Sequence, residues 1–343
     1  MRARSFHISA WFVVACAVLA SSMVWGASDP APPAQAAIDA LIRANAAVVG
    51  VDVRATDDAR SAQSLGDHRV GSGVVIGNDG LILTIGYLML EADTIQIITH
   101  DHRTLPARAV GYDIATGFGL VKSLLPLRIA PAPLGRLQEL NPGDAVMAAT
   151  GGEDSDVAIT RLVSKRPFSG YWEYHIDAAL FTSPPIGNHS GAALFNRRGE
   201  LLGIGSLFVA NSMGEGHGIV PGNMFVPVDL LRPILGELQR TGTTAQSRRP
   251  WRGLTSSEQG GRVQVVRVTK DSPAELAGIE RGDVVLAVDD APVATLEEFY
   301  KRIWAHAKPD DIIKLTILQG DESKVLAVKG IDRMTTMAKP RGI

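Results

Sequence analysis

Short apolar runs rich in β-branched residues, separated by Gly, Asp and Pro, fill the chain between residues 48 and 228. Runs of this length at regular intervals predict the strands of an all-β barrel or sandwich. Asn78-Asp79-Gly80 lies between two of them and predicts a hairpin, because Asp-Gly tolerates the positive φ of a tight turn. The predicted strands are 48–53, 70–76, 81–84, 94–99, 107–111, 145–149, 201–207 and 218–228.

Helical patterns border this β-rich region. Residues 34–47 have helical character, and the amphipathic residues 230–240 predict a closing helix. The segment after it, residues 241–250, is polar, rich in turn residues and without apolar periodicity. It predicts a linker between two domains.

A second unit begins at Trp251. Ser272 to Glu275 predicts a helix start, with a capping box and proline at the first helical position. A second capping box, Thr295 to Glu298, opens a predicted helix that runs to about residue 306. The predicted strands of this unit are 263–268, 282–288, 312–318 and 324–328.

The N-terminus has the layout of a secretory signal. Arg2 and Arg4 precede an apolar run over residues 8–25, and small residues follow at two candidate cleavage sites. Because the run is close to the length that spans a bilayer, an uncleaved anchor is the alternative. Cys16 lies in a sequence that resembles a lipoprotein cleavage box, but the apolar run continues well past it. We therefore expect export to the periplasm, or an inner-membrane anchor that faces it.

Composition narrows the class further. Of 343 residues, 45% are hydrophobic and 20% charged, as in a soluble globular protein with room for two to three domains. A net charge of −2 gives no electrostatic reason to expect nucleic-acid binding. Cys16 is the only cysteine, so removal of the signal would leave no disulfide and no thiolate metal site. No histidine spacing fits a zinc site, and no nucleotide-binding motif occurs, so we expect neither a metal nor a cofactor.

Two motifs carry the candidate chemistry. Asn188-His189-Ser190-Gly191-Ala192-Ala193-Leu194 precedes a predicted strand, and residues 71–84 lead into Ile85-Gly86-Tyr87. Together they resemble the trypsin-fold proteases of the HtrA/DegP type, whose serine loop reads Gly-Asn-Ser-Gly-Gly-Pro-Leu. The resemblance implies that Ser190 holds the position of the nucleophile. It also places Asn188, with Ser190, at the oxyanion hole, where the family has a glycine.

The other two positions of the triad are changed. The resemblance aligns Tyr87 with the catalytic histidine and Gly117 with the catalytic aspartate, while Asp113 and Lys122 of the family pattern remain. We expect Asp113 to cap a turn. A phenol, with a pKa near ~10, is a poor proton acceptor from serine at neutral pH. Loss of the base in such a triad costs about 10⁶ in turnover.

Other histidines are weak substitutes for the missing base. His189 adjoins Ser190, but neighbouring side chains on an extended loop usually point apart. We expect His100 and His102 at a hairpin tip, His175 packed on a barrel face, and His217 in a loop that could touch a ligand but is more simply exposed to solvent.

From residue 251 onward the chain resembles a bacterial PDZ domain of the circularly permuted HtrA kind. The resemblance implies that backbone N–H groups of Arg252, Gly253 and Leu254 bind a peptide carboxylate while the peptide adds a strand to the sheet edge. Arg252 replaces an apolar residue of the family and could attract a carboxylate or spoil the pocket. The groove-lining helix residues would be Phe299, Tyr300 and Ile303, which could equally belong to the core. The alternative to peptide binding is that this unit has a purely structural role or serves contacts between protomers.

These observations predict a mainly β protein, a trypsin-like double β-barrel followed by a PDZ domain. We expect a signal peptide or membrane anchor at residues 1–27, followed by a spacer and short helix at 28–44 and the protease-homologue domain at 45–240. A linker at 241–250 then leads to the PDZ domain at 251–335 and a tail at 336–343.

The favoured function is that of a pseudoprotease, which binds unfolded proteins, peptide C-termini or a partner in envelope protein quality control. One alternative is an active serine endopeptidase that uses Ser190 with an unconventional base. The other is a regulatory subunit in a hetero-oligomer with an active HtrA-type protease. A homo-oligomer is also compatible with the sequence.

Overall fold

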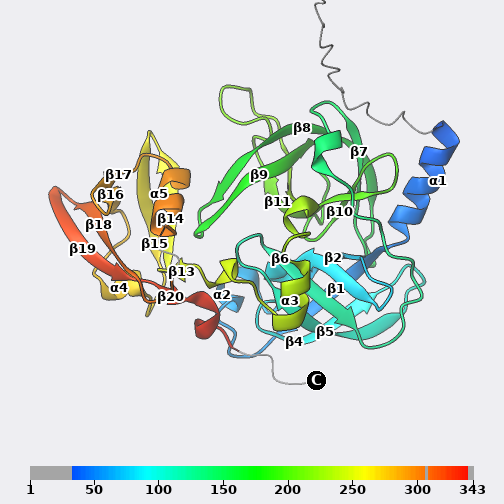
Figure 1. Ribbon diagram of the computed structural model, residues 1–343, viewed down its shortest axis with the longest axis horizontal. Coiled ribbons are helices and arrows are strands. Elements are labelled where there is room, and N and C mark those ends of the chain that lie inside the picture. Colours follow the sequence, from blue (N-terminus) through cyan, green and yellow to red (C-terminus); the bar gives the residue numbers. More distant parts are fainter. Residues whose placement is uncertain (1–32, 306–307, 339–343) are drawn as a thin grey trace, which may run out of the picture. The chain divides into compact units, whose positions relative to one another are not determined.

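The β-rich region folds into two closed barrels. In this computed structural model, which describes residues 33–305 and 308–338, the first barrel has the strand order β1-β2-β3-β6-β5-β4 (Figure 1). All its pairs are antiparallel, and the Asp79-Gly80 turn joins β2 to β3 as predicted. The strands are β1 (Val48–Ala55), β2 (His68–Val75), β3 (Leu81–Ile85), β4 (Ala92–Ile98), β5 (Thr104–Tyr112) and β6 (Phe118–Ser123).

The second barrel has the order β10-β11-β12-β9-β8-β7 and contains three strands that the apolar pattern did not predict. These are the long β8 and β9 and the short β10, which follows Ser190. In β8 buried, half-buried and exposed positions are interspersed with charged residues, so no apolar run marks it. The strands are β7 (Ala145–Ala149), β8 (Val157–Gly170), β9 (Tyr174–Ser183), β10 (Ala193–Phe195), β11 (Leu201–Val209) and β12 (Gly222–Pro227).

Helices close the barrel region at both ends. Helix α1 (Ala34–Asn45) matches the predicted helix, whereas α3 (Leu235–Thr241) begins five residues later than predicted. Pro233 lies in the segment before α3, where a 3-10 turn η3 (Val228–Leu230) replaces the first predicted helical residues. Proline disfavours helical geometry in the residue before it, which explains the late start. The short helical turns are α2 (Ala62–Leu65), η1 (Gly86–Met89), η2 (Leu137–Glu139) and η4 (Gln246–Arg248).

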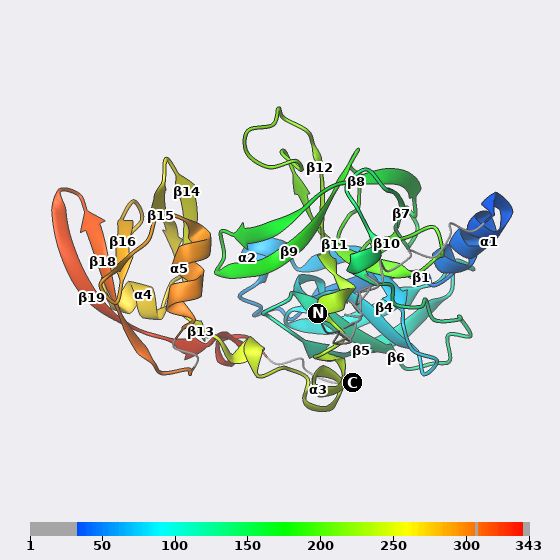
Figure 2. The ribbon, with the colours of Figure 1, turned by 45° about the horizontal axis from the view of Figure 1, so that its top comes forward.

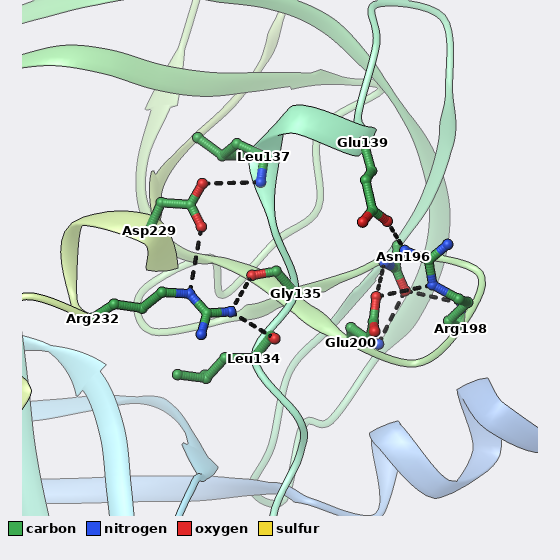
Figure 3. A network of polar contacts seen from close by, with 9 residues as sticks. All are labelled: Leu134, Gly135, Leu137, Glu139, Asn196, Arg198, Glu200, Asp229 and Arg232. Carbon is green, nitrogen blue, oxygen red and sulfur yellow. Dashed lines mark hydrogen bonds and ion pairs between the residues drawn. The ribbon is translucent and has the colours of Figure 1, made fainter. Parts of the chain in front are cut away.

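A polar network fastens the segment that connects the two barrels (Figure 3). Arg232 donates to the carbonyl oxygens of Leu134 and Gly135, and Asp229 accepts the Leu137 N–H. On the other side, Arg198 from the β10–β11 turn forms ion pairs with Glu139 and Glu200. The network thereby holds the connecting segment against the hairpin that directly follows the serine loop.

The second unit is a sheet with the order β14-β15-β16-β18-β19, flanked by two helices (Figure 2). Strand β14 lies at one edge of this sheet. The elements are β13 (Pro250–Trp251), β14 (Leu254–Gln259), β15 (Arg262–Val268), α4 (Pro273–Leu276), β16 (Val284–Val288), β17 (Ala291–Pro292), α5 (Leu296–Ile303), β18 (Ile312–Gln319), β19 (Glu322–Lys329), β20 (Ile331–Asp332) and η5 (Arg333–Thr336).

Both predicted helix starts are present. Thr295 and Glu298 form the complete capping box of α5. At α4 the Ser272 side chain accepts the Glu275 N–H, but the Glu275 carboxylate binds the N–H of Asp271 rather than that of Ser272. Helix α5 ends at Ile303, and residue 306, its predicted end, lies outside the described residues.

Residues 241–250, predicted as a linker, are not free of the barrel. Thr244 and Ser247 are buried, and both hydroxyls donate to the carboxylate of Asp113. Contacts between residues join the barrels and the second unit into one compact body. Polar composition predicted a solvated linker here, but its hydroxyls are used inside the structure.

The predicted signal or anchor at residues 1–27, with Cys16, lies outside the described residues. Within residues 33–305 and 308–338, no helix has both the length and the apolar character needed to cross a membrane.

Candidate functional site

The serine loop, residues 186–192, is fixed by backbone bonds to both barrels. The Ser190 carbonyl oxygen accepts the Ser72 N–H of β2 at 2.8 Å, and the Gly191 N–H donates to the Gly205 carbonyl oxygen of β11 at 2.8 Å. Gly191 has a φ of 76°, and a Cβ there would lie 1.9 Å from the Ser72 carbonyl oxygen. Only glycine fits this position, so the match to the family pattern at Gly191 has a packing reason.

Tyr87, in η1, reaches across to the serine. Its hydroxyl oxygen lies 2.7 Å from Ser190 Oγ and 2.8 Å from the carbonyl oxygen of Ser206 in β11. Tyr87 therefore occupies the place of a hydrogen-bond partner of Ser190, where the resemblance predicted a base. Ser206 was not predicted as part of the site, since no motif marks it.

The Ser206 carbonyl decides which way the phenol proton points. A carbonyl oxygen only accepts, whereas a hydroxyl both donates and accepts. The arrangement that satisfies both contacts has Tyr87 donating to Ser206 and accepting the proton of Ser190. Burial raises the pKa of Tyr87 to about 12. At neutral pH the phenol is protonated, so it can hold the serine hydroxyl in place but cannot take its proton.

Gly117 leaves the acid position without a side chain. Its φ is 86°, its N–H donates to the Asp113 carbonyl oxygen at 2.7 Å, and its own carbonyl oxygen accepts the Gly86 N–H at 2.7 Å. A Cβ at Gly117 would lie 3.5 Å from the Tyr174 hydroxyl. A Cβ is thus at ordinary contact distance, but the backbone would stay in the left-handed region, which costs a residue with a Cβ about 1–2 kcal/mol.

Asp113 caps the turn that leads to Gly117, as predicted. One carboxylate oxygen accepts both the N–H and the hydroxyl of Thr116, at 2.9 and 2.6 Å. The other oxygen accepts the hydroxyls of Thr244 and Ser247. The carboxylate is fully buried and directed to these donors, so its contacts are structural.

Asn188 lies at the exposed start of the serine turn with a φ of 46°. Asparagine is among the residues that tolerate this left-handed conformation best. The backbone geometry that glycine serves in the family pattern is thus accessible here, and a role for the Asn188 and Ser190 N–H groups in an oxyanion hole stays a prediction.

The histidines do not replace the base. Within the part of the chain that the structure describes, Ser190 Oγ has no histidine within hydrogen-bonding distance. Burial lowers the pKa of His189. His175 is buried on β9 and bonded to Ser169, as expected for packing, whereas the rings of His100 and His217 bind the backbone carbonyls of Asn45 and Glu215. His102 has a φ of 57° in the β4–β5 turn.

The predicted carboxylate loop of the PDZ-like unit, residues 251–254, already holds a carboxylate. The N–H groups of Arg252, Gly253 and Leu254 donate to the side chain of Glu173, with the shortest bonds from Gly253 at 2.7 Å and Leu254 at 2.8 Å. Glu173 lies in the turn between β8 and β9 and was not among the predicted site residues.

The predicted groove residues divide in two. Phe299 and Ile303 are fully buried in the core of the second unit. Tyr300 is also buried, but its hydroxyl lies 2.7 Å from the Gly170 carbonyl oxygen and 3.3 Å from the Glu173 nitrogen. Among the three, Tyr300 therefore contacts the turn that brings Glu173 to the carboxylate loop.

The structure also gathers His175, Asp177 and Glu297, whose ligand atoms lie within 4.8 Å of one another. No spacing in the sequence indicated this group. The Lys301 ammonium lies 3.1 Å from Asp177 and 2.7 Å from Glu297 and supplies the positive charge. The arrangement is therefore an ion-pair cluster between β9 and α5.

Comparison with known proteins agrees with both parts of the fold. The family model for a trypsin-like peptidase domain matches residues 71–204, and that for a PDZ domain matches residues 250–329. The chain is 29% identical to the serine endoprotease DegS of Escherichia coli over 306 residues, which cover 84% of each protein. It is also 29% identical to a probable periplasmic serine endoprotease, DegP-like, of Pseudomonas putida, over 69% of this chain and 50% of that protein.

Two solved structures of proteases are also similar to this chain in fold. A serine endoprotease from Yersinia pestis is similar at a TM-score of 0.53 and 25% identity, over 88% of this chain and 99% of that one. The HtrA-type protease AlgW, solved with a tripeptide, is similar in fold at a TM-score of 0.53 and 21% identity, over 86% of this chain and 96% of that one.

Proposed function

Because the chain belongs to the HtrA/DegP/DegS family of trypsin-like peptidases with a C-terminal PDZ domain, we propose that it is a pseudoprotease of that family. In this proposal it binds unfolded or C-terminal peptide segments, or a protein partner, in protein quality control of the envelope. Its serine loop then contributes to the fold and not to catalysis.

One observation carries the proposal. The Tyr87 hydroxyl lies between Ser190 Oγ and the Ser206 carbonyl oxygen, with a pKa raised to about 12. Activation of Ser190 by Tyr87 would require the phenolate. With a pKa of about 12, only about 10⁻⁵ of the molecules carry it at pH 7, and the phenolate would face the Ser206 carbonyl oxygen without a proton between them.

The acid position supports the same conclusion. A triad needs an acid to orient its base, and Gly117 offers no side chain while Asp113 is committed to Thr116, Thr244 and Ser247. Base and acid are thus lost together, which leaves at most the residual catalysis of binding and an oxyanion hole.

Peptide binding rests on the second unit. Three successive N–H groups at Arg252 to Leu254 converge on one carboxylate, and β14 supplies an edge strand. The relative AlgW was solved with a tripeptide and with a decapeptide. The DegP-like relative is named periplasmic, and the signal-like N-terminus of this chain supports export to the same compartment.

Cleavage of unfolded casein, compared between the wild type and Ser190→Ala, tests the proposal. We expect the same slow background from both proteins and no Ser190 labelling by a fluorophosphonate probe. Cleavage or labelling that disappears in Ser190→Ala would instead establish the active endopeptidase with an unconventional base. The regulatory-subunit alternative predicts co-purification with a second, active protease, so a pure homo-oligomer would count against it.

A further inference from the structure

The Glu173 carboxylate occupies the place of a peptide terminus. A PDZ domain recognises a C-terminal peptide by backbone N–H groups that bind its carboxylate. Here Glu173 Oε1 accepts from Gly253 at 2.7 Å, from Leu254 at 2.8 Å and from Arg252 at 3.2 Å, and Oε2 accepts from Arg252 at 3.1 Å. Both carboxylate oxygens of one internal side chain are bound by this loop.

The main chain of the same turn uses the sheet edge. Ser256 of the edge strand β14 donates its N–H to the Tyr171 carbonyl oxygen at 2.8 Å. A bound peptide adds to the edge strand through hydrogen bonds of this kind. The β8–β9 turn, residues 170–173, therefore occupies two sites that would bind a peptide. These are the N–H groups of the carboxylate loop and a main-chain hydrogen bond of the edge strand.

Helix α5 holds the turn from the other side. The Tyr300 hydroxyl lies 2.7 Å from the Gly170 carbonyl oxygen and 3.3 Å from the Glu173 nitrogen. The turn is thus inserted between β14 and α5.

The positive charge of a buried arginine, Arg252, also acts on the Glu173 carboxylate. Arg252 is fully buried, with one guanidinium nitrogen donating to the Pro250 carbonyl oxygen. Its Nε and Nη2 atoms are buried without a hydrogen-bond partner among the described residues. Burial raises the pKa of the Glu173 carboxyl, whereas the bond from the Leu254 N–H and the charges of Arg252 and Arg333 act in the opposite direction. Here the charge of Arg252 acts on an internal carboxylate, and its effect on a bound peptide stays a prediction.

Glu173 adopts a conformation that its own backbone does not favour. Its φ of 55° lies in the left-handed region, which a residue with a long side chain rarely adopts without compensation. The bonds from the carboxylate loop and Tyr300 supply the compensation.

We propose that the β8–β9 turn is an internal competitor for the peptide groove, with Glu173 in the position of a peptide's C-terminal carboxylate. A peptide with a free C-terminus binds only to molecules in which the turn has left, so its apparent affinity is reduced by the open fraction. The inference rests on the proposed peptide-binding function and adds a control to it. It also gives β8 and β9 a role, since peptide binding would release their turn from the second unit.

Glu173→Gln tests the proposal in the full chain, because the amide keeps the size of the side chain but loses its charge. The probe is a pool of fluorescein-labelled octapeptides of random sequence with free C-termini, followed by anisotropy, beside the same pool with amidated C-termini. We expect the free-acid pool to bind Glu173→Gln at least about tenfold more tightly than the wild type, and the amidated pool to bind neither. Glu153→Gln, an exposed glutamate beyond the opposite end of β8, is the matched control and should behave as the wild type.

Hydrogen exchange of the amides at Arg252, Gly253, Leu254 and Ser256 gives a second readout that needs no ligand. We expect these amides to be protected in the wild type and in Glu153→Gln, and to exchange at least about tenfold faster in Glu173→Gln. Tyr300→Phe, which removes the hydroxyl that holds the turn, should shift exchange in the same direction and covers the case of a poorly folded Glu173→Gln. Equal exchange and equal peptide affinity in the wild type and both variants would overturn the inference. Faster exchange without peptide binding to any protein would show that Glu173 holds the loop closed, but would overturn the proposed peptide-binding function and with it the competition.

Discussion

The Tyr87 hydroxyl lies 2.7 Å from Ser190 Oγ, the distance at which a catalytic base would lie from its nucleophile. The distance fits a base beside its nucleophile, but burial raises the pKa of this phenol to about 12. At neutral pH the phenol is therefore protonated and cannot accept the serine proton. In the proposed pseudoprotease, Tyr87 thus holds the serine hydroxyl without activating it.

The pH dependence of serine labelling separates the possible bases. A base acts in its deprotonated form, so labelling of Ser190 rises as pH passes the pKa of that base. Dependence on His189 would give a midpoint below 6.5, because burial lowers the pKa of His189, and dependence on Tyr87 would give one at about 12. We expect fluorophosphonate labelling to stay at the level of Ser190→Ala from pH 5 to 9. A sigmoidal rise within this range would contradict the pseudoprotease.

Restoring the missing groups should restore part of the activity. We expect Tyr87→His with Gly117→Asp to hydrolyse unfolded casein at least ~100-fold faster than the wild type, a fraction of the ~10⁶ that a full triad contributes. The gain is limited by Asn188 and by the left-handed backbone at Gly117, where φ is 86°. Gly117→Asp alone should gain nothing, since no base is present.

The control for this gain is the same double variant with Ser190→Ala, which should return to the wild-type background. A double variant that neither cleaves casein nor is labelled at Ser190 would contradict the prediction.

The fold could be predicted from sequence wherever local chemistry decides the structure. The Asp79-Gly80 turn and the Thr295–Glu298 capping box depend on neighbouring residues and are present. Strand β8 was missed because Arg161, Lys165 and Arg166 divide its apolar residues and Pro167 interrupts its pattern. Helix α3 was placed too early because the apolar periodicity extends through Pro233, where the backbone does not follow it.

The candidate site shows the same division. Ser190, Tyr87 and Gly117 could be located because each lies in a motif with fixed spacing. Glu173 could not, because its partner Gly253 is 80 residues away and nothing local marks the contact. Its only signal is an acidic residue within an aromatic turn, Tyr171 to His175, which is equally compatible with an exposed loop.

Two glycines of the serine loop give a matched test of its packing. A Cβ at Gly191 would lie 1.9 Å from the Ser72 carbonyl oxygen at a φ of 76°, whereas a Cβ at Gly187 would meet nothing within 4 Å. We expect Gly191→Ala to lower the free energy of unfolding by about 2–5 kcal/mol, from overpacking and left-handed strain together. Gly187→Ala should stay within about 0.5 kcal/mol of the wild type. Urea denaturation measures both, and equal midpoints would mean that the loop is not held against β2 as described.

Substitution of Asp113 tests whether this residue of the family motif has a structural role. Asp113→Ala removes the acceptor of the Thr116 N–H and of three hydroxyls, those of Thr116, Thr244 and Ser247. We expect a loss of about 3–5 kcal/mol in the free energy of unfolding, because breaking a buried charged network leaves its donors unpaired. Asp93→Ala, at an exposed position of β4, is the control and should change stability by less than about 0.5 kcal/mol.

The same variant reports on residues 241–250. Thr244 and Ser247 bind the Asp113 carboxylate, so its loss should also release this segment from the first barrel. Limited proteolysis with trypsin would then cut after Arg248 at least ~10-fold faster than in the wild type, because cleavage follows the population of the locally opened state. If Asp113→Ala is destabilised but cut no faster after Arg248, the segment is held by its other contacts and Asp113 acts only on its own turn.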